Sequence, residues 1–258
     1  MKISLEGKTA WITGAGSGIG RAAVTALVKA GVKVGLSGRR HEPLKETLAA
    51  IQSLNGEGIL APVNVADSEA VVAAAEKIRA ELGEIDILVN SAGLNLPKRR
   101  YSEMGVGDWQ MVIDVNLNGA YNCIYAVLPH MRDRGDGLII NVSSWAGRHD
   151  SYVAGPAYGA SKHAMSSMTA TINLEEGRNG IRCCSLEPAE VATEILDRRP
   201  IPVADIERAR MLQPDDLGET IRFIAEMPAH VCLNEVLISP TWNRSHMGGS
   251  DWFPGPPS

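Results

Sequence analysis

Tyr158 and Lys162 form the residue pair whose types and spacing best suit proton transfer. They lie four positions apart within residues 157–176, a stretch that predicts a helix, so both side chains share one helical face. A free phenol has a pKa of about 10 and is a poor acid–base catalyst at neutral pH, but a neighbouring ammonium group favours the phenolate and lowers that pKa. The pair therefore predicts acid–base chemistry on a hydroxyl or carbonyl group.

A glycine-rich turn near the N-terminus is the second chemical signal. Residues 14–20 read GAGSGIG and lie between an apolar run at 9–12 and a helix-forming stretch at 21–30. Glycine is needed where the backbone turns tightly, approaches a pyrophosphate, and lets the helix pack close on the strand. The phosphates then bind free N–H groups at the helix N-terminus. The turn therefore predicts a dinucleotide cofactor held by Gly14, Ser17, Gly18, Ile19 and Gly20.

The end of the second apolar run indicates which dinucleotide binds. A fold that binds NAD usually has a carboxylate about 20 residues past the glycines, where it takes the ribose 2′-hydroxyl. This chain has Ser37, Gly38, Arg39 and Arg40 there and no acid. A guanidinium binds a 2′-phosphate through paired hydrogen bonds, whereas a carboxylate repels it. We therefore expect NADP, contacted by Arg39 and Arg40; the alternative is that both arginines belong to a solvated loop.

A third group of residues completes a family pattern. Ser143 and Ser144 precede the sequence Tyr158-Gly159-Ala160-Ser161-Lys162. Together with the glycine turn, these residues resemble the short-chain dehydrogenase/reductase family over residues 5–239. The resemblance implies that Ser144 holds the substrate oxygen beside the tyrosine, with Ser143 as the alternative. It also implies that Lys162 hydrogen-bonds the nicotinamide ribose and that Asn116 holds a water linking this lysine to solvent.

The same resemblance implies further cofactor contacts beyond the strand ends. Residues 90–93 match the family's Asn-Asn-Ala-Gly motif with a serine at the second position, and Asn90 is placed to tie neighbouring strands. Ala189 replaces a glycine of the family, which restricts the backbone there. The glycine turn lacks the basic residue of many NADP-dependent members, so NAD stays open as the cofactor. The implied contacts are Asn64, Val65, Asn90, Ala92, Gly93, Tyr158, Lys162, Pro188, Val191 and Thr193.

The elements that must position these residues follow from the alternation of apolar runs and amphipathic helical stretches. Strands of continuous apolar character are expected where helices cover both faces of a parallel sheet, so the pattern predicts a doubly wound α/β (Rossmann) fold of about seven strands. The expected strands are residues 9–12, 32–36, 59–63, 85–89, 138–142, 181–186 and 236–238. Residues 193–212 interrupt the alternation, which is typical of a functional or mobile insertion.

We expect residues 1–247 to form one dinucleotide-binding and catalytic domain. The tail at 248–258 is rich in glycine and proline but carries Trp252 and Phe253, so it is expected either to fray or to dock on a neighbouring subunit. Similar proteins assemble through the helices that carry Asn116 and Tyr158, which implies a homotetramer or homodimer. The residues available for apolar contact there are Tyr121, Tyr125, Met165 and Met168.

Composition excludes several classes of partner. The 258 residues carry a net charge of −5 without a block of five like charges, which argues against a nucleic-acid partner. No apolar run approaches the roughly 18–20 residues of a membrane span, and the N-terminus lacks a signal-peptide pattern, so we expect a cytoplasmic protein. The cysteines and histidines lack metal-site or redox spacing, which predicts buried thiols and no metal. The cysteines are Cys123, Cys183, Cys184 and Cys232.

The loops that follow the strands are rich in cations. If some converge, they favour a small anionic substrate such as a hydroxy acid, an oxo acid or a sulfonate; the alternative is that they are solvated loop charges. These cations are Lys98, Arg99, Arg100, Arg148, Arg198, Arg199, Arg208 and Arg210. The candidate substrate contacts are Ser144, Trp145, Arg148, His149, Tyr152 and Glu190.

Taken together, the residues predict an NADP-dependent oxidoreductase that transfers hydride between the nicotinamide and a small carbonyl or alcohol, with Tyr158 as acid and base. Two alternatives remain. The first is an NAD-dependent alcohol dehydrogenase of the same fold. The second is a non-catalytic dinucleotide-sensing protein, although proteins of that kind typically lack the tyrosine or the lysine.

Overall fold

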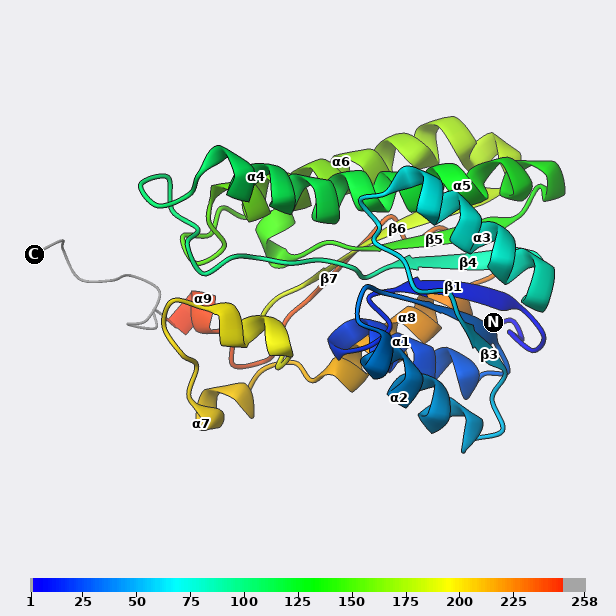
Figure 1. Cartoon of the computed structure of the whole chain (residues 1–258), viewed down its shortest axis with the longest axis horizontal. Coiled ribbons are helices and arrows are strands. Elements are labelled where there is room, and N and C mark those ends of the chain that lie inside the picture. Colours follow the sequence, from blue (N-terminus) through cyan, green and yellow to red (C-terminus); the bar gives the residue numbers. More distant parts are fainter. Residues whose placement is uncertain (1, 248–258) are drawn as a thin grey trace, which may run out of the picture.

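Seven parallel strands form one sheet in the computed structural model, which describes residues 2–247 (Figure 1). The strand order is β3-β2-β1-β4-β5-β6-β7, so the chain begins inside the sheet, winds to one edge, and then returns to build the other. The strands are β1 (Thr9–Thr13), β2 (Lys33–Ser37), β3 (Gly58–Leu60), β4 (Ile85–Asn90), β5 (Gly137–Val142), β6 (Ile181–Pro188) and β7 (Glu235–Ile238). The predicted doubly wound α/β fold is confirmed.

The edge strand β3 is shorter than the predicted run at 59–63. The chain beyond Leu60 still runs beside β2, where the N–H of Ala61 donates to the Leu36 carbonyl at 2.9 Å and that of Val63 to Gly38 at 3.1 Å. Because β2 itself ends at Ser37, the residues that follow β3 have no strand left to pair with.

Helices cover both faces of the sheet (Figure 1). One layer contains α1 (Gly18–Val28), α2 (His41–Gln52) and α8 (Pro214–Ala225). The other contains α3 (Ser68–Leu82), α4 (Val106–Ile113), α5 (Gly119–Arg134) and α6 (Pro156–Glu176). Strands β1, β5 and β6 are buried along their whole length, as continuous apolar strands between two helical layers should be.

Alternate residues of β1 supply two separate hydrophobic cores, because successive strand side chains point to opposite faces. Ile12 belongs to the core under α1 and α2, with Leu27 and Leu36, whereas Trp11 belongs to the core under α3 and α5. The buried indole N–H of Trp11 donates to the Ser37 hydroxyl at 2.8 Å, so its polar group is satisfied. Each fully buried large apolar side chain contributes about 1.5–3 kcal/mol to folding.

The ends of α3 follow the sequence closely. The Asp67 carboxylate accepts a hydrogen bond from the Ala70 N–H at 3.1 Å, which satisfies one free donor of the first turn. Gly83 closes the helix with a φ of 94°, a conformation that favours glycine. Both termini are therefore set by local residue types.

Residues 193–212 form an ordered segment over the carboxyl ends of the strands. A short 3-10 helix (Glu194–Arg198) and α7 (Asp205–Arg208) lie within it, and Leu196, Val203 and Met211 make a small apolar cluster of their own. Another short helix, α9 (Arg244–Met247), follows β7. The predicted docking or fraying of 248–258 lies outside the described residues.

Two expectations about single residues need correction. Cys123, Cys183 and Cys184 are buried free thiols, but Cys232 is partly exposed because it lies in the loop before the edge strand β7. Met165 is fully buried and therefore cannot supply an exposed contact, whereas Tyr121 and Tyr125 are exposed on α5. Within residues 2–247, the helices are too short or too polar to cross a membrane.

Candidate active site

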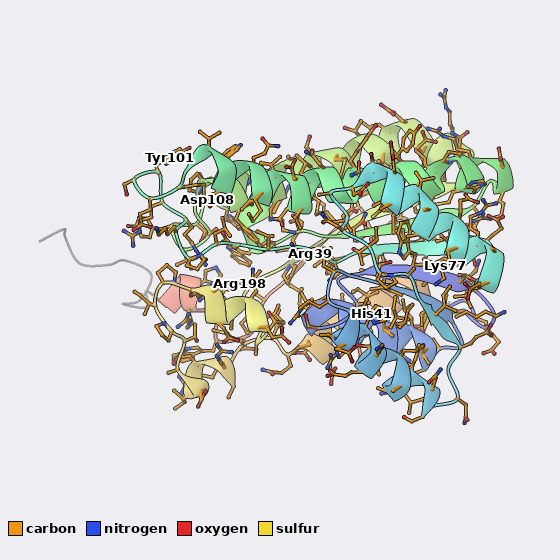
Figure 2. All side chains as sticks on the ribbon, in the orientation of Figure 1. Arg39, His41, Lys77, Tyr101, Asp108 and Arg198 are labelled. Carbon is orange, nitrogen blue, oxygen red and sulfur yellow. The ribbon has the colours of Figure 1, made fainter. Side chains whose placement is uncertain are left out.

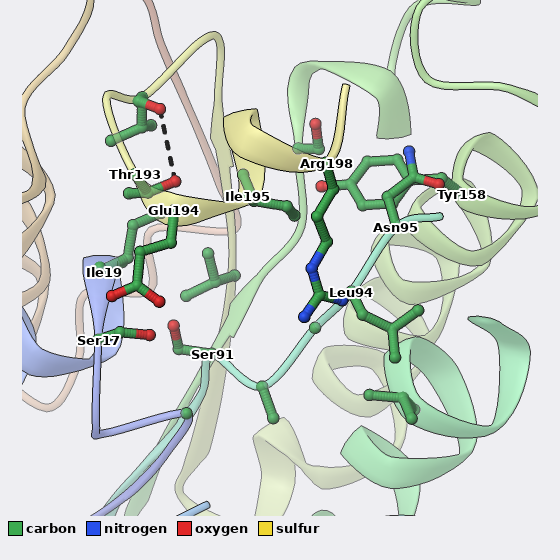
Figure 3. Close-up of a pocket in the computed structure, with 18 of the residues that line it drawn as sticks. Ser17, Ile19, Ser91, Leu94, Asn95, Tyr158, Thr193, Glu194, Ile195 and Arg198 are labelled. Atoms are coloured by element: carbon green, nitrogen blue, oxygen red, sulfur yellow. Dashed lines mark hydrogen bonds between the residues drawn. The ribbon is translucent and has the colours of Figure 1, made fainter. Parts of the chain in front are cut away.

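A cavity of about 860 Å³ opens at the carboxyl ends of the strands. Figure 3 shows Ser17 and Ile19 of the glycine turn on one side and Asn95 and Tyr158 on the other, with the segment from Thr193 to Arg198 between them. Ligands of doubly wound sheets bind in this position. Six cationic and three acidic side chains line the cavity although the whole chain is acidic, so its wall suits an anionic ligand.

Most of the predicted cofactor residues lie on this wall. Those lining it are Gly14, Ser17, Gly18, Ile19, Arg39, Arg40, Asn64, Val65, Ala92, Gly93, Tyr158, Lys162, Pro188, Val191 and Thr193. Gly20 and Asn90 do not line it, which corrects their prediction as direct contacts. Both lie behind the wall and shape it from there.

The glycine turn is shaped by close backbone approaches. Gly14 has a φ of 66°, and a Cβ atom there would lie 2.8 Å from the carbonyl oxygen of Ser91 in the next loop of the wall. A Cβ at Gly20 would lie 2.3 Å from the carbonyl oxygen of Gly14. A side chain at either position would displace the loop, so these glycines hold open the cradle at the start of α1.

Arg39 and Arg40 follow β2 at the other end of this cradle. Arg39 is exposed, lines the cavity, and has no carboxylate partner within residues 2–247. Figure 2 shows it beyond β2, whereas Lys77 lies on α3, away from the cavity. Arg40 reaches the Glu194 carboxylate at 3.1 Å and the Ser17 hydroxyl at 3.4 Å, so it spans from the glycine turn to the segment after β6.

Asn90 ties β4 to its neighbours as the sequence predicts. Its amide donates to Asn141 of β5 at 2.9 Å, and the Asn141 amide in turn donates to Thr169 of α6 at 2.9 Å. This buried polar network fixes β4, β5 and α6 relative to one another, and α6 carries the predicted catalytic pair.

Tyr158, Ser144 and Lys162 meet at the inner part of the cavity. The Ser144 hydroxyl lies close enough to the Tyr158 phenol to affect its pKa, and the Nζ atom of Lys162 lies 5.6 Å from the centroid of the tyrosine ring. The lysine donates to the carbonyl of Val142 at 2.7 Å. Ser143 instead points behind α6, where its hydroxyl donates to the Lys162 carbonyl at 3.0 Å. The geometry therefore places Ser144, not Ser143, beside the phenol.

The local environment shifts both titratable groups. Burial raises the pKa of the Tyr158 phenol, while the Ser144 hydroxyl and the positive charges of Arg99 and Arg199 act to lower it. Burial lowers the pKa of Lys162 to about 8. Among the chain's residues, the sequence argument assigned the electrostatic support of the phenolate to Lys162. In the structure the charges that lower the pKa of the phenol are those of Arg99 and Arg199.

Asn116 lies in a π-helical turn, Asp114–Asn118, between α4 and α5. Its carboxamide accepts from the Leu94 N–H at 2.8 Å and donates to the Leu94 carbonyl at 3.0 Å and to the Ser161 hydroxyl at 3.1 Å. The π turn is the kind of helix irregularity that often accompanies a functional site. Asn116 thus fixes the loop after β4 against the helix that carries the lysine.

Glu190, which the sequence left without a role, is the centre of a buried ion-pair cluster. Its carboxylate accepts from Arg244 at 2.8 and 2.9 Å and from Arg199 at 2.5 Å. Burial opposes its ionisation, but the hydrogen bonds from Arg244 and the charge of Arg199 hold the pKa of Glu190 below its usual range. This cluster joins α9 to the cavity wall.

Three predicted substrate contacts do not line the cavity. Arg148 turns to Glu235 at 3.2 Å, the ring of His149 packs 4.7 Å from that of Trp145, and Tyr152 lies under the Arg100 guanidinium at 4.6 Å. These three side chains are exposed and pair with residues that the sequence does not reveal. Ser144, Trp145 and Glu190 do line the cavity.

Two of the wall residues that the sequence did not name as contacts are Asn95 and Arg99. Asn95 lines the cavity beside Tyr158 and donates to the Ala154 carbonyl at 2.9 Å (Figure 3). Arg99 is only 5% exposed and also lines the cavity. The basic run at 98–100 was the available signal, but it does not indicate which of its members points inward.

Comparison with known proteins agrees with this arrangement. The family model described as short chain dehydrogenase matches residues 8–201. The chain belongs to this family. An uncharacterized oxidoreductase of Staphylococcus saprophyticus is 36% identical in sequence to this dehydrogenase. The matched region covers 92% of the present chain and 99% of the Staphylococcus protein.

Two solved structures share the fold of this dehydrogenase. An alcohol dehydrogenase from the archaeon Thermococcus sibiricus, complexed with 5-hydroxy-NADP, has a TM-score of 0.82 at 27% identity and covers 92% of this chain and 98% of that one. The closed form of a serine dehydrogenase complexed with NADP+ has a TM-score of 0.80 at 30% identity and covers 90% of this chain and 94% of that one. This dehydrogenase is an oxidoreductase.

Proposed function

We propose that this dehydrogenase transfers hydride between NADP(H) and the carbonyl or alcohol carbon of a small molecule, with Tyr158 as the acid and base. The observation that supports this proposal most directly is that Ser144, Tyr158 and Lys162 line one cavity together with the glycine turn. The nicotinamide supplies or accepts the hydride when it is bound. The chain's own residues must orient the substrate and move the proton.

The residues on the wall fit NADP along its length. The glycine turn at the start of α1 offers free N–H groups to the pyrophosphate, and no side chain fills the cradle at Gly14. Arg39 and Arg40 stand where a 2′-phosphate would lie. Lys162, Val191 and Thr193 would hold the nicotinamide end. The similar alcohol and serine dehydrogenases were solved with NADP or a derivative of it, which supports NADP over NAD.

The proton path uses Ser144, Tyr158 and Lys162, which line the same cavity. Ser144 donates a hydrogen bond to the substrate oxygen, and the Tyr158 hydroxyl gives that oxygen a proton in reduction or takes one in oxidation. The positive charges of Arg99 and Arg199 favour the phenolate that remains after donation. Asn116 holds the water that connects Lys162 to solvent.

The positive charge of the wall favours a small anionic substrate, such as a hydroxy acid, an oxo acid or a sulfonate. The similar serine dehydrogenase is named for a substrate that bears a carboxylate. We further propose a cytoplasmic homodimer or homotetramer that assembles through the exposed tyrosines of α5, Tyr121 and Tyr125, whose rings stack with centroids 6.4 Å apart.

A Tyr158→Phe variant tests the catalytic proposal. It should bind NADPH with unchanged affinity, measured by nucleotide fluorescence, and should lose at least about a hundredfold in turnover of a panel of small aldehydes and ketones. Unchanged turnover would refute the role of the tyrosine. A wild-type protein that binds NADPH but turns over none of the panel would favour the non-catalytic sensing alternative, and tighter binding of NADH than of NADPH would favour the NAD-dependent one.

A further inference from the structure

Three arginines from different segments meet on the cavity wall near Tyr158. Arg99 comes from the loop after β4, and Arg198 and Arg199 end the 3-10 helix after β6. The other basic residues of these loops point elsewhere: within the described chain, Arg208 pairs with Asp197, and the guanidinium of Arg210 lies 4.9 Å above the ring of Trp242. Of the cations in the loops that follow the strands, three therefore line the cavity.

The guanidinium of Arg99 donates its hydrogen bonds to main-chain carbonyl groups. Its Nε donates to the Leu96 carbonyl at 2.6 Å, its Nη1 to Val153 at 3.0 Å, and its Nη2 to Arg198 at 2.7 Å. It therefore ties the loops before α4 and before α6 to the segment after β6. The third bond fixes the main chain of Arg198 from inside the protein.

Arg199 is held just as firmly on the other side. It pairs with Glu190, which Arg244 also holds, so one carboxylate serves two arginines. Burial, and next to it the neighbouring charge of Arg199, lower the pKa of Arg99 to about 10. The two guanidinium groups therefore lie close enough for an anion between them to be attracted by both.

Arg198 is the member of the three whose guanidinium is free to bind. Its main chain is fixed by Arg99 and its neighbour by Glu190, yet its side chain is exposed within the cavity and has no carboxylate partner among residues 2–247. Figure 3 shows the side chain extending toward Leu94, beside Tyr158 and Asn95. An arginine on a fixed backbone loses less freedom when it binds than one on a mobile loop.

We propose that Arg198 is the receptor for a carboxylate or sulfonate group of the substrate and that Arg99 and Arg199 supply the surrounding positive field. The inference rests on the proposed function and deepens it, because it makes the substrate an oxo or hydroxy acid or its sulfonate counterpart. The anionic group is bound by the forked donors of Arg198 while the carbonyl oxygen lies at Ser144 and Tyr158.

Paired substrates that differ only in charge provide the test. We suggest 3-oxobutanoate and its methyl ester, 2-oxobutanoate and its methyl ester, and 2-oxopropane-1-sulfonate, each reduced with NADPH. Wild type should prefer the anions. Arg198→Gln should raise KM for the anions about tenfold or more and change KM for the esters less than about twofold, whereas Arg198→Lys, which keeps the charge without the fork, should fall between.

Matched controls separate this inference from the proposed function. Arg210→Gln removes an arginine of the same segment that does not line the cavity, and it should change neither KM. Calorimetric titration of the oxo acids into protein loaded with NADP+, which cannot reduce them, measures binding without turnover, so failure of catalysis leaves the inference testable. Three results would each overturn the inference. The first is that Arg198→Gln raises KM equally for acid and ester, and the second is that wild type binds none of the anions. The third is that Arg198→Gln loses as much affinity for NADPH as it loses for the anions.

Discussion

Replacing Glu190 with glutamine should destabilise this dehydrogenase by a large and pH-dependent amount. The carboxylate is 9% exposed and accepts three hydrogen bonds from two arginines, Arg199 and Arg244, whose side chains are 15% and 7% exposed. Glu190→Gln keeps the shape and one acceptor oxygen but removes the negative charge. The two cations then lose the carboxylate that they share, although Glu207 still lies 4.0 Å from Arg244.

The magnitude follows from the burial of the group. Breaking a buried ion pair by removing one partner costs about 3–5 kcal/mol, and the remaining amide oxygen brings the expected loss to about 3 kcal/mol. For a chain of this size, that corresponds to a fall in Tm of about 6–12 °C. The folded pKa of Glu190 is lowered, so its stabilising effect is present above the pKa of an unfolded glutamate, about 4.3, and is lost as the pH falls through the folded pKa.

Urea unfolding of wild type and variant between pH 8 and pH 4 measures this effect. The difference in unfolding free energy should stay constant down to about pH 5 and shrink only below that. Glu194→Gln is the matched control, because Glu194 pairs with Arg40 where both side chains are 63% exposed, and it should cost less than about 0.5 kcal/mol. Equal losses in the two variants would refute the reasoning that burial makes Glu190 decisive.

Other perturbations test the rest of the site. Lys162→Met should abolish turnover. It should also be more stable than wild type at pH 7 by up to about 3 kcal/mol, because burial lowers the folded pKa of the lysine to about 8. Urea titrations should show this stability gain shrinking as the pH rises from about 8 to about 10.5, and a gain that stays constant would contradict the lowered pKa. Arg39→Ala should weaken NADP binding about tenfold or more in a fluorescence titration and leave NAD binding unchanged. Lys77→Ala of α3 is the control and should change the binding of neither nucleotide. Equal weakening of NADP and NAD binding would exclude a contact between Arg39 and the 2′-phosphate. Native protein at pH 7.5 should react rapidly with a thiol reagent only at Cys232, since the other three cysteines are buried, and mass mapping of a different site would show that the fold opens there.

Much of the fold and of the site could be predicted from patterns of residues that are close together in the sequence. The glycine turn, the tyrosine–lysine spacing and the apolar runs each depend on residues close together in the chain, so sequence alone placed the cofactor cradle, the catalytic helix and seven strands. Residues 193–212 were recognised as unusual for the same reason. Their ordered course was not predictable, because it depends on Arg99, nearly a hundred positions upstream.

The loop charges show where sequence reasoning stops. Arg148 and Arg198 look alike in the sequence, but one pairs with Glu235 on β7 and the other faces the cavity. The choice depends on which partners the fold brings within a few ångströms, and these partners are far away in the chain. The same holds for Glu190, whose role appears only when Arg199 and Arg244 converge on it.

The sequence by itself determined the family, the doubly wound sheet and the chemical class of the enzyme, because these rest on short-range spacing and on the periodicity of apolar residues. Only the tertiary structure decided that Ser143 is held against Lys162 while Ser144 faces Tyr158, and that Arg99, Arg198 and Arg199 are the members of the substrate-loop cations that line the cavity. A side chain's direction and its neutralising partners are products of packing between distant segments, and packing is what the linear order of residues does not contain.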